Sequence, residues 1–353
     1  MKTLKSLILI LSLIPICLNG QMLKTDTFKF VFEGKTRIGL IDQRIDKKAK
    51  SLIIVIPGDG QTNLDFGLIK DLRSHLTEMG LICCVWDKEG CGKSEGKYND
   101  RQTIQNSANE FLTAIKELKR QKIKGSDNIG LWGISRAGWI APLIIQEDKS
   151  ISFWISVSGV DDKDNNTYLL EQNLIIQGRP KDDVELLIAE YRAGNRLFWQ
   201  GGTYEEYVNA TNNIYKDPFF VKLHGEQYSE EEYLEAQKEA MSQYQFDNQT
   251  ASIIMIPEFS KILKQIQCPV LAIFGEKDTQ VDWRKTIDYY QQTIGQNDKS
   301  RLTIKTFPNC GHPILKCRTC GIDYSDLKEF NYEPCDNYND TMFEGLKVHR
   351  FIN

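Results

Sequence analysis

The sequence predicts an α/β fold with a mostly parallel sheet and helices on both faces. Short, continuous apolar runs recur along the chain, as is typical of strands that are buried on both faces. These runs lie at 52–56, 81–86, 129–132 and 151–157. Stretches with helical character separate them, and strand–helix alternation of this kind favours parallel strands.

The length and composition agree with this class. The chain has 353 residues, of which 41% are hydrophobic and 26% charged, enough for one large α/β domain with an insertion or for two domains. The net charge of −4 argues against a nucleic-acid partner, because contacts to phosphates need clustered Lys and Arg.

The N-terminus has the pattern of a secretory signal peptide over residues 1–20. A basic start precedes an apolar run over 7–16, and Gly20 supplies a small residue at the end. This run is shorter than the ~20 residues that a membrane-spanning helix needs, although an uncleaved anchor is the alternative. We therefore expect a secreted or periplasmic protein, without stable membrane insertion once the signal is removed.

The first half of the chain is expected to build most of the sheet. Phenylalanines alternate with other residues over 28–33, which is typical of a half-buried strand, and 37–42 is the expected hairpin partner. Helices are expected over 63–79, 103–118 and 137–146.

Residues 161–258 interrupt the strand pattern and are expected to form a helical insertion. They are polar, aromatic and helix-prone, with helices expected over 171–198 and 229–244. Strands return at 269–274 and 302–307. The chain thus divides into a signal peptide (1–20), the first part of the α/β core (21–160), the helical insertion (161–258), the second part of the core (259–315) and a cysteine-rich C-terminal extension (316–353).

Ser135 is a candidate nucleophile between the strand that ends at Trp132 and the helix that follows. Gly133 and Ala137 flank it at positions −2 and +2, where a tight strand-to-helix turn requires small residues. The serine would stand at a helix N-terminus, where backbone N–H groups and the helix dipole favour developing negative charge.

Candidates for an acid and a base follow Ser135 in the chain. Asp278 comes just after a predicted strand, at the sheet edge where ligands bind, and Glu276 is the alternative acid. His312 follows the last predicted strand. The other histidines lack this position: His75, His224 and His349. In the resulting triad His312 takes the proton from Ser135, Asp278 holds the imidazole tautomer, and the serine becomes acylated.

Three motifs resemble those of the α/β-hydrolase family. Residues 54–60, Ile-Val-Ile-Pro-Gly-Asp-Gly, resemble its oxyanion loop, and residues 86–94 resemble its Asp-x-Arg-Gly-x-Gly-x-Ser turn. Residues 133–142 resemble the elbow of the serine aminopeptidase-like and esterase branches. The resemblance covers the core, about 25–160 and 260–315, and implies the α/β-hydrolase fold with a helical cap insertion over the active site.

The resemblance also implies an oxyanion hole from the backbone N–H groups of Asp59 and Arg136, with no metal and no organic cofactor. Glu89 stands where the family has Arg, so an ion pair made by that Arg would be lost or inverted. Ala137 replaces the usual Gly, and Pro57 stands where many members have His. The aromatic residues of the insertion would line an acyl pocket or form a small core of their own.

Four cysteines cluster near His312 in the sequence: Cys310, Cys317, Cys320 and Cys335. Disulfides are favoured in an exported protein, although the Cys-x-x-Cys spacing also suits zinc, and the spacing does not determine the pairing. Either arrangement would hold His312 in place. Glycans would be expected only in a eukaryotic secretory pathway, at four sequons: Asn165, Asn209, Asn248 and Asn339.

The sequence therefore predicts a secreted serine hydrolase that cleaves a small carboxylic ester through an acyl-enzyme. A peptidase or aminopeptidase with a peptide-like substrate, or a thioesterase, is the enzymatic alternative, because the same acyl-enzyme serves all of them. A catalytically inactive binding protein is the non-enzymatic alternative. An aminopeptidase would need an insertion carboxylate for the substrate ammonium, and the candidates are Glu171, Asp182, Asp183, Glu185, Glu205 and Glu206.

Overall fold

The computed structural model describes residues 22–324 and 327–352 of the chain. Eight strands form one sheet in the order β1-β2-β4-β3-β5-β6-β9-β10. Strand β1 (Leu23–Phe32) pairs antiparallel with β2 (Lys35–Arg44), β2 pairs antiparallel with β4, and the other pairs are parallel. The prediction of a mostly parallel sheet is confirmed. The signal peptide expected over 1–20 lies outside the described residues.

The parallel part of the sheet is built from the apolar runs of the sequence. Its strands are β3 (Leu52–Ile56), β4 (Ile82–Trp86), β5 (Ile129–Ile134), β6 (Ile151–Val157), β9 (Val270–Gly275) and β10 (Leu302–Phe307). Every residue of β3, β4 and β9 is buried, because helices cover both faces there. Strand β10 lies at the edge and is only partly buried.

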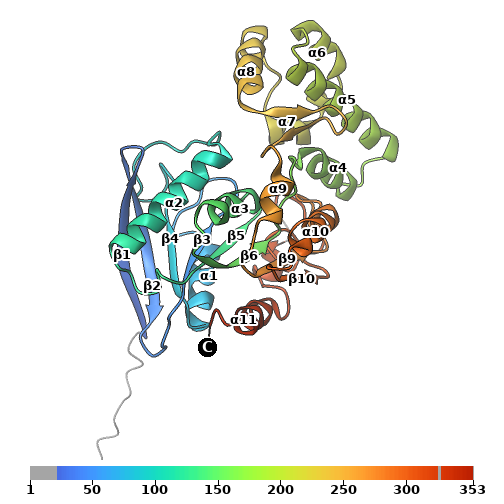
Figure 1. Ribbon diagram of the computed structural model, residues 1–353. Helices are drawn as coiled ribbons and strands as arrows, with labels where there is room; N and C mark the ends of the chain where they lie inside the picture. The colour runs from blue at the N-terminus through green and yellow to red at the C-terminus, as the bar shows by residue number, and fades with distance from the viewer. Residues whose placement is uncertain (1–21, 325–326, 353) are drawn as a thin grey trace, which may run out of the picture.

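Helices cover both faces of the sheet (Figure 1). One face carries α1 (Gly67–Glu78) and α11 (Tyr338–Val348). The other carries α2 (Ile104–Arg120), α3 (Ala137–Glu147), α9 (Phe259–Lys264) and α10 (Trp283–Gln292). Helix α2 begins after Thr103, whose side chain accepts a hydrogen bond from the N–H of Asn106, and it buries the apolar stripe that the sequence indicated.

The helical insertion leaves the core after β6 and returns to it at α9. Figure 1 shows that most of it stands apart from the sheet. Its elements are α4 (Asn166–Ile176), α5 (Lys181–Gln200), α6 (Tyr204–Ala210), the 3₁₀ turn η1 (Ile214–Lys216), α7 (Pro218–His224), α8 (Glu230–Gln243) and the hairpin strands β7 (Gln245–Asp247) and β8 (Ser252–Ile254). The insertion is joined to α2 by an exposed ion pair between Arg101, just before that helix, and Glu239 on α8, at 3.3 Å.

The single helix expected over 171–198 is wrong, because two helices occupy this stretch. Helix α4 ends before Gly178, whose φ of +74° suits glycine, and α5 begins after Pro180. A proline at the start of a helix is tolerated, but inside a helix it removes a hydrogen bond and clashes with the preceding turn. The chain therefore turns between α4 and α5.

The insertion has a hydrophobic core of its own. Leu170 and Leu174 on α4, Leu187 and Ile188 on α5, and Phe220 on α7 are buried together. Several aromatic side chains of the insertion pack on one another rather than on the sheet. Of the two expectations for these aromatic residues, the structure favours a separate small core.

The C-terminal extension follows β10 with little regular structure before α11. Two disulfides hold it: Cys335 is joined to Cys310 of the core, and Cys317 is joined to Cys320, at Cα–Cα distances of 6.2 and 5.2 Å. This agrees with the disulfide expectation and leaves none of the four thiolates for zinc. In the described parts of the chain, no group of three or more His, Cys, Asp or Glu side chains is placed to hold a metal ion.

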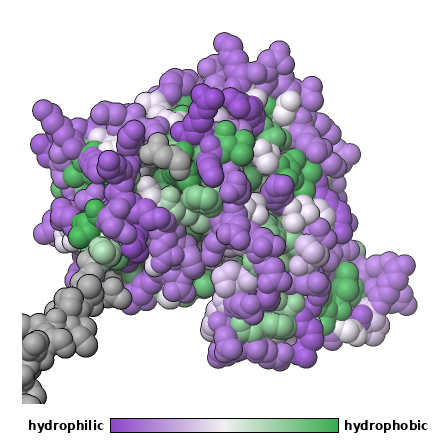
Figure 2. Space-filling model, turned by 90° about the horizontal axis from the view of Figure 1, so that it is seen from below, coloured by the Kyte–Doolittle hydropathy of each residue, from purple (hydrophilic) through white to green (hydrophobic). Residues whose placement is uncertain are grey.

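The surface does not carry one broad apolar face on the side that Figure 2 shows. Apolar residues form separate patches there, between hydrophilic residues. Within 22–324 and 327–352, no helix is both long and apolar enough to cross a membrane.

Candidate active site

Ser135 occupies a strained turn between β5 and α3. Its φ of +58° is unusual for a residue with a side chain. A Cβ atom on Gly133 would lie 2.6 Å from Cβ of Ala137, so the turn requires glycine at position 133. The N–H of Ser135 donates to the carbonyl oxygen of Val157 on β6 at 2.9 Å, which fixes the turn to the neighbouring strand. This geometry matches a nucleophile elbow.

Asp278 and His312 form a buried pair. The Nδ1 atom of His312 lies 2.8 Å from Oδ2 of Asp278, and the two residues are 5% and 2% exposed. The other oxygen, Oδ1, accepts hydrogen bonds from the backbone N–H groups of Gln280 at 2.8 Å and Val281 at 3.0 Å. Because the carboxylate accepts from Nδ1–H, the imidazole keeps Nε2 free to accept a proton.

The alternative acid, Glu276, points elsewhere. Its Oε1 atom accepts a hydrogen bond from Oγ1 of Thr306 on β10 at 2.8 Å. Asp278 is therefore the carboxylate that the structure brings to His312.

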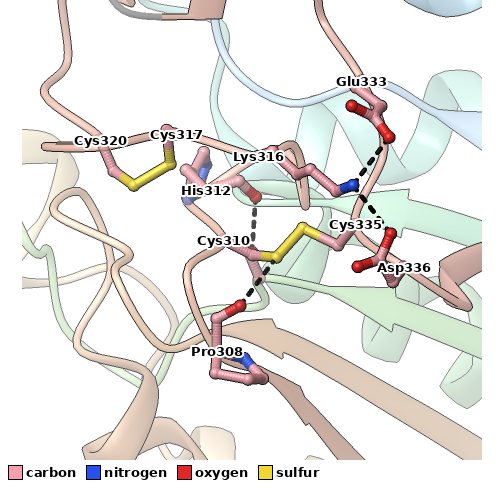
Figure 3. Close-up of a disulfide and its surroundings, with 10 residues drawn as sticks. Pro308, Cys310, His312, Lys316, Cys317, Cys320, Glu333, Cys335 and Asp336 are labelled. Carbon is pink, nitrogen blue, oxygen red and sulfur yellow. Dashed lines mark hydrogen bonds and ion pairs between the residues drawn. A yellow bond between two sulfur atoms is a disulfide. The ribbon is translucent and has the colours of Figure 1, made fainter. Parts of the chain in front are cut away.

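The loop that carries His312 is held on several sides. Oγ of Ser158, just after β6, donates to the carbonyl oxygen of His312 at 2.7 Å. Figure 3 shows His312 between the two disulfides, with Cys310 before it in the chain and Cys317 after it. These bonds restrain the backbone on both sides of the imidazole.

The helical insertion and the C-terminal extension both contact the turn that carries Asp278. Tyr168 of α4 donates its hydroxyl hydrogen to the carbonyl oxygen of Asp278 at 2.9 Å. Oγ1 of Thr279 donates to the carbonyl oxygen of Cys320 in the extension at 2.8 Å. The acid is thus positioned from both sides.

Ser135 and His312 line the same cleft, which has a volume of about 940 Å³. Residues 57–60 form part of its rim. A Cβ atom on Gly58 would lie 3.2 Å from Cβ of Ser135, so this loop passes directly beside the serine. Asp59, whose N–H the resemblance assigned to the oxyanion hole, lines the cleft as well.

The side chain of Arg136 turns away from this cleft. Its guanidinium donates to Oγ of Ser107 at 3.2 Å and also bonds to the carbonyl oxygen of Gln102. Arg136 lines a neighbouring polar cavity of about 390 Å³, together with Asp59 and two residues of α8, Glu239 and Gln243. The guanidinium is therefore directed away from Ser135, and only the backbone of Arg136 lies beside the serine.

Lys88 is a site residue that the sequence analysis did not single out. Its Nζ atom donates to the carbonyl oxygens of Gly58 at 2.6 Å and Gly60 at 2.7 Å, on either side of Asp59. Burial lowers the pKa of this ammonium to about 8. The signal in the sequence was its place in the motif at 86–94, but only the fold shows which loop it reaches.

Glu89, at the position where the resemblance expects Arg, forms ion pairs with two basic residues of β2. It accepts from Lys35 at 2.5 Å and from Arg37 at 2.6 Å. Arg37 is fully buried and also bonds to Glu110 at 3.2 Å. The carboxylate of Glu89 is therefore balanced by the positive charges of Arg37 and Lys35 on β2.

Helix α1 and the C-terminal extension form the walls of the cleft. From α1 and the turn before it come Phe66, Leu68, Ile69, Leu72 and His75. From the extension and the residue before it come Leu315, Leu327, Phe330, Tyr332 and Pro334. Among the described residues, none between 161 and 258 lines this cleft. The expectation that the insertion caps the serine stays a prediction, since its described residues reach the site through Tyr168 and the cavity that shares Asp59 rather than through this cleft. The six carboxylates considered for a substrate ammonium lie on α4–α6, outside the cleft.

No family model and no curated protein matches this sequence. Solved structures are similar in fold. An esterase of Pyrococcus furiosus has a TM-score of 0.52 at 16% identity, over 92% of this chain and 91% of its own. A proline iminopeptidase of Mycobacterium smegmatis has a TM-score of 0.52 at 13% identity, over 92% of this chain and 99% of its own. Est1E of Butyrivibrio proteoclasticus with bound ferulic acid has a TM-score of 0.50 at 16% identity, over 92% and 98%.

These likenesses extend over nine-tenths of the chain, and so over the whole sheet. At such low identity they describe architecture rather than substrate. The chain has the α/β-hydrolase fold.

Proposed function

We propose that this protein is a serine hydrolase that cleaves carboxylic esters through an acyl-enzyme. The observation that carries the proposal is the buried Asp278–His312 pair, whose imidazole opens into the same cleft as Ser135 on its strained turn. All three groups stand in the chain order of the fold's catalytic triad.

The geometry supports a two-step mechanism. Nε2 of His312 takes the proton of Ser135 as Oγ attacks the ester carbonyl, and Asp278 stabilises the imidazolium. The N–H groups of Asp59 and Arg136 would stabilise the oxyanion. His312 then gives its proton to the leaving alcohol, and a water molecule activated by the same imidazole releases the acid from Ser135.

An ester is favoured over a peptide substrate by the lining of the cleft. An aminopeptidase needs a carboxylate near the serine to hold the substrate ammonium, and the carboxylates of the insertion lie outside the cleft. The acids that do line it are few: Asp59, Asp71 and Glu333, of which Glu333 pairs with Lys316 at 2.7 Å.

Export is part of the proposal. The signal-peptide pattern over 1–20 and the two disulfides of the extension support a secreted or periplasmic protein.

The test is labelling of the purified protein with a fluorophosphonate, which reacts with an activated serine. We expect the wild type and Ser242→Ala, an exposed serine of α8, to be labelled and Ser135→Ala to remain unlabelled. A panel of an ester, a thioester and an aminoacyl-arylamide then ranks the substrates, with the ester expected first. A folded wild type that is not labelled would favour the inactive binding protein instead.

A further inference from the structure

We infer that the substrate is an ester of a large apolar carboxylic acid, and that the C-terminal extension is the wall that selects it. The inference rests on the proposed function, since the cleft matters only if Ser135 is acylated. It assigns the acyl group of the substrate, of about eight carbons or more, to the space between α1 and the extension.

The first argument is the size and lining of the cleft. Its volume of about 940 Å³ lies at the upper end of the range for small-molecule sites, far above what an acetyl group would fill. Most of its lining is aliphatic or aromatic. A short or charged acyl group would leave this apolar surface in contact with water.

The second argument is the way in which the extension is attached. Leu315 and Leu327 are buried against the Cys317–Cys320 disulfide, and Leu68 of α1 packs against this small cluster. The two walls are therefore held to each other, and the space between them is preformed. Preformed apolar sites favour a ligand that fills them, because little ordering is needed on binding.

The third argument is two exposed aromatic side chains at the cleft. Phe66, before α1, is 53% exposed, and Tyr332, in the extension, is 45% exposed. Large apolar groups that remain exposed beside a cleft are typical of ligand-binding surfaces. An acyl chain between them would remove apolar surface from water on both sides.

The fourth argument is the contrast between the two cavities that share Asp59. The cavity on the insertion side is lined by charged and polar residues, among them Lys88, Arg136 and Glu239. Ser135 lines the apolar cleft and does not line the polar cavity. The acyl group is bonded to Ser135 from the end of the first step until water releases it in the second, so it belongs in the apolar cleft that Ser135 lines. The polar side suits the departing alcohol.

The experiment compares kcat/KM for p-nitrophenyl acetate, butyrate, octanoate and dodecanoate with the purified protein. Burial of each methylene is expected to raise kcat/KM about threefold, so octanoate should exceed acetate by at least about 100-fold. Phe66→Ala and Tyr332→Asn should each lower the octanoate value about tenfold and lower the ratio of octanoate to acetate kcat/KM several-fold. Asparagine is chosen because Tyr332 has a φ of +55°, which asparagine adopts readily.

Tyr228→Ala is the matched control, since Tyr228 is an aromatic residue of the insertion that is 36% exposed. It should change neither value, and thermal melting should show that all three variants are folded. The inference is overturned if acetate is hydrolysed as well as octanoate, or if Tyr228→Ala lowers octanoate hydrolysis as much as Tyr332→Asn does. Absence of both fluorophosphonate labelling and ester hydrolysis would instead overturn the proposed function, so the two failures are distinguishable.

Discussion

The helical insertion and the C-terminal extension are two additions to one sheet, and they relate to the candidate site in opposite ways. The insertion is much the larger, yet it contributes nothing to the described lining of the cleft that holds Ser135 and His312. The extension is shorter and is irregular before α11, yet it supplies one wall of that cleft. The size of an addition is therefore a poor guide to its place in the chemistry.

The difference has a physical cause. The insertion buries enough leucine, isoleucine and aromatic surface to stabilise its own fold, so it can stand apart from the sheet. The apolar cluster of the extension is small and is completed by a disulfide and by Leu68 of α1. The part of the extension before α11 has little core of its own and packs on the loop of His312 and on α1, while α11 packs on the sheet.

The largest expected effect on kcat comes from Asp278, in the turn that both the insertion and the extension contact. Asp278→Asn places an amide against Nδ1 of His312, so the imidazole adopts the tautomer that cannot accept the proton of Ser135. We expect kcat to fall about 10³–10⁴-fold in ester hydrolysis. Glu276→Gln is the control and should stay near wild type. Equal losses in both variants would contradict the assignment of the acid.

The second expected effect is a loss of unfolding free energy when the disulfides of the extension are removed. Replacing both Cys310 and Cys335 by serine opens a loop of 25 residues, which is expected to cost about 3.5 kcal/mol of unfolding free energy. The matching change at Cys317 and Cys320 opens a loop of three residues and should cost about 1.5 kcal/mol. Denaturant titrations measure both.

The loss of kcat should also be larger for the Cys310–Cys335 variant than for the Cys317–Cys320 variant, because both disulfides restrain the chain beside His312. The insertion has no disulfide among its described residues, so its own melting should not respond to a reductant. If removal of Cys317 and Cys320 changes neither the melting temperature nor kcat, that disulfide does not hold the histidine loop.

The third effect concerns the side of the site that the insertion reaches. Lys88→Met removes the donor to Gly58 and Gly60, and we expect kcat to fall about tenfold as the loop with Asp59 loses its support. Since the pKa of Lys88 is about 8, wild-type activity should decline above that pH as charge-assisted bonds weaken. A Lys88→Met profile with the same decline would assign it to another group.

The contribution of Lys88 to stability should rise with pH, whereas its contribution to activity should fall. The ammonium has a pKa of about 8 in the fold against 10.5 for the free side chain, so between these values the unfolded chain binds more protons. The contribution of Lys88 to the unfolding free energy therefore rises with pH across this window. Comparing wild type and Lys88→Met at pH 8 and pH 10 isolates this contribution, and an equal slope in both would contradict it.

The smallest effect tests whether the insertion acts on the chemistry at all. Tyr168→Phe removes one hydrogen bond to the carbonyl of Asp278, which is expected to cost about 1 kcal/mol of stability and to change kcat less than about threefold. A loss greater than about tenfold in a steady-state ester assay would break the comparison, since the insertion would then control the acid from outside the cleft.

The sheet was predictable because burial on both faces leaves short, continuous apolar runs such as 52–56. The break at Pro180 was visible as a Gly-Arg-Pro sequence, but the helical character on both sides of it outweighed that signal. The wall of the cleft was not predictable, since four cysteines allow three pairings and the position of Tyr332 depends on which one forms. The triad of Ser135, Asp278 and His312 stays a prediction, which the geometry supports and the labelling experiment tests.

The Cys310–Cys335 disulfide also has a consequence for the timing of biosynthesis. Cys335 leaves the ribosome after the sheet, the insertion and His312 have all been made, and its thiol needs an oxidising compartment to join Cys310. A chain still in a reducing compartment would therefore carry a finished sheet and an unfinished cleft. If the chain is exported and cleaves esters as proposed, passage across the membrane is the step that completes the cleft, and esters on the side where the protein is made are spared.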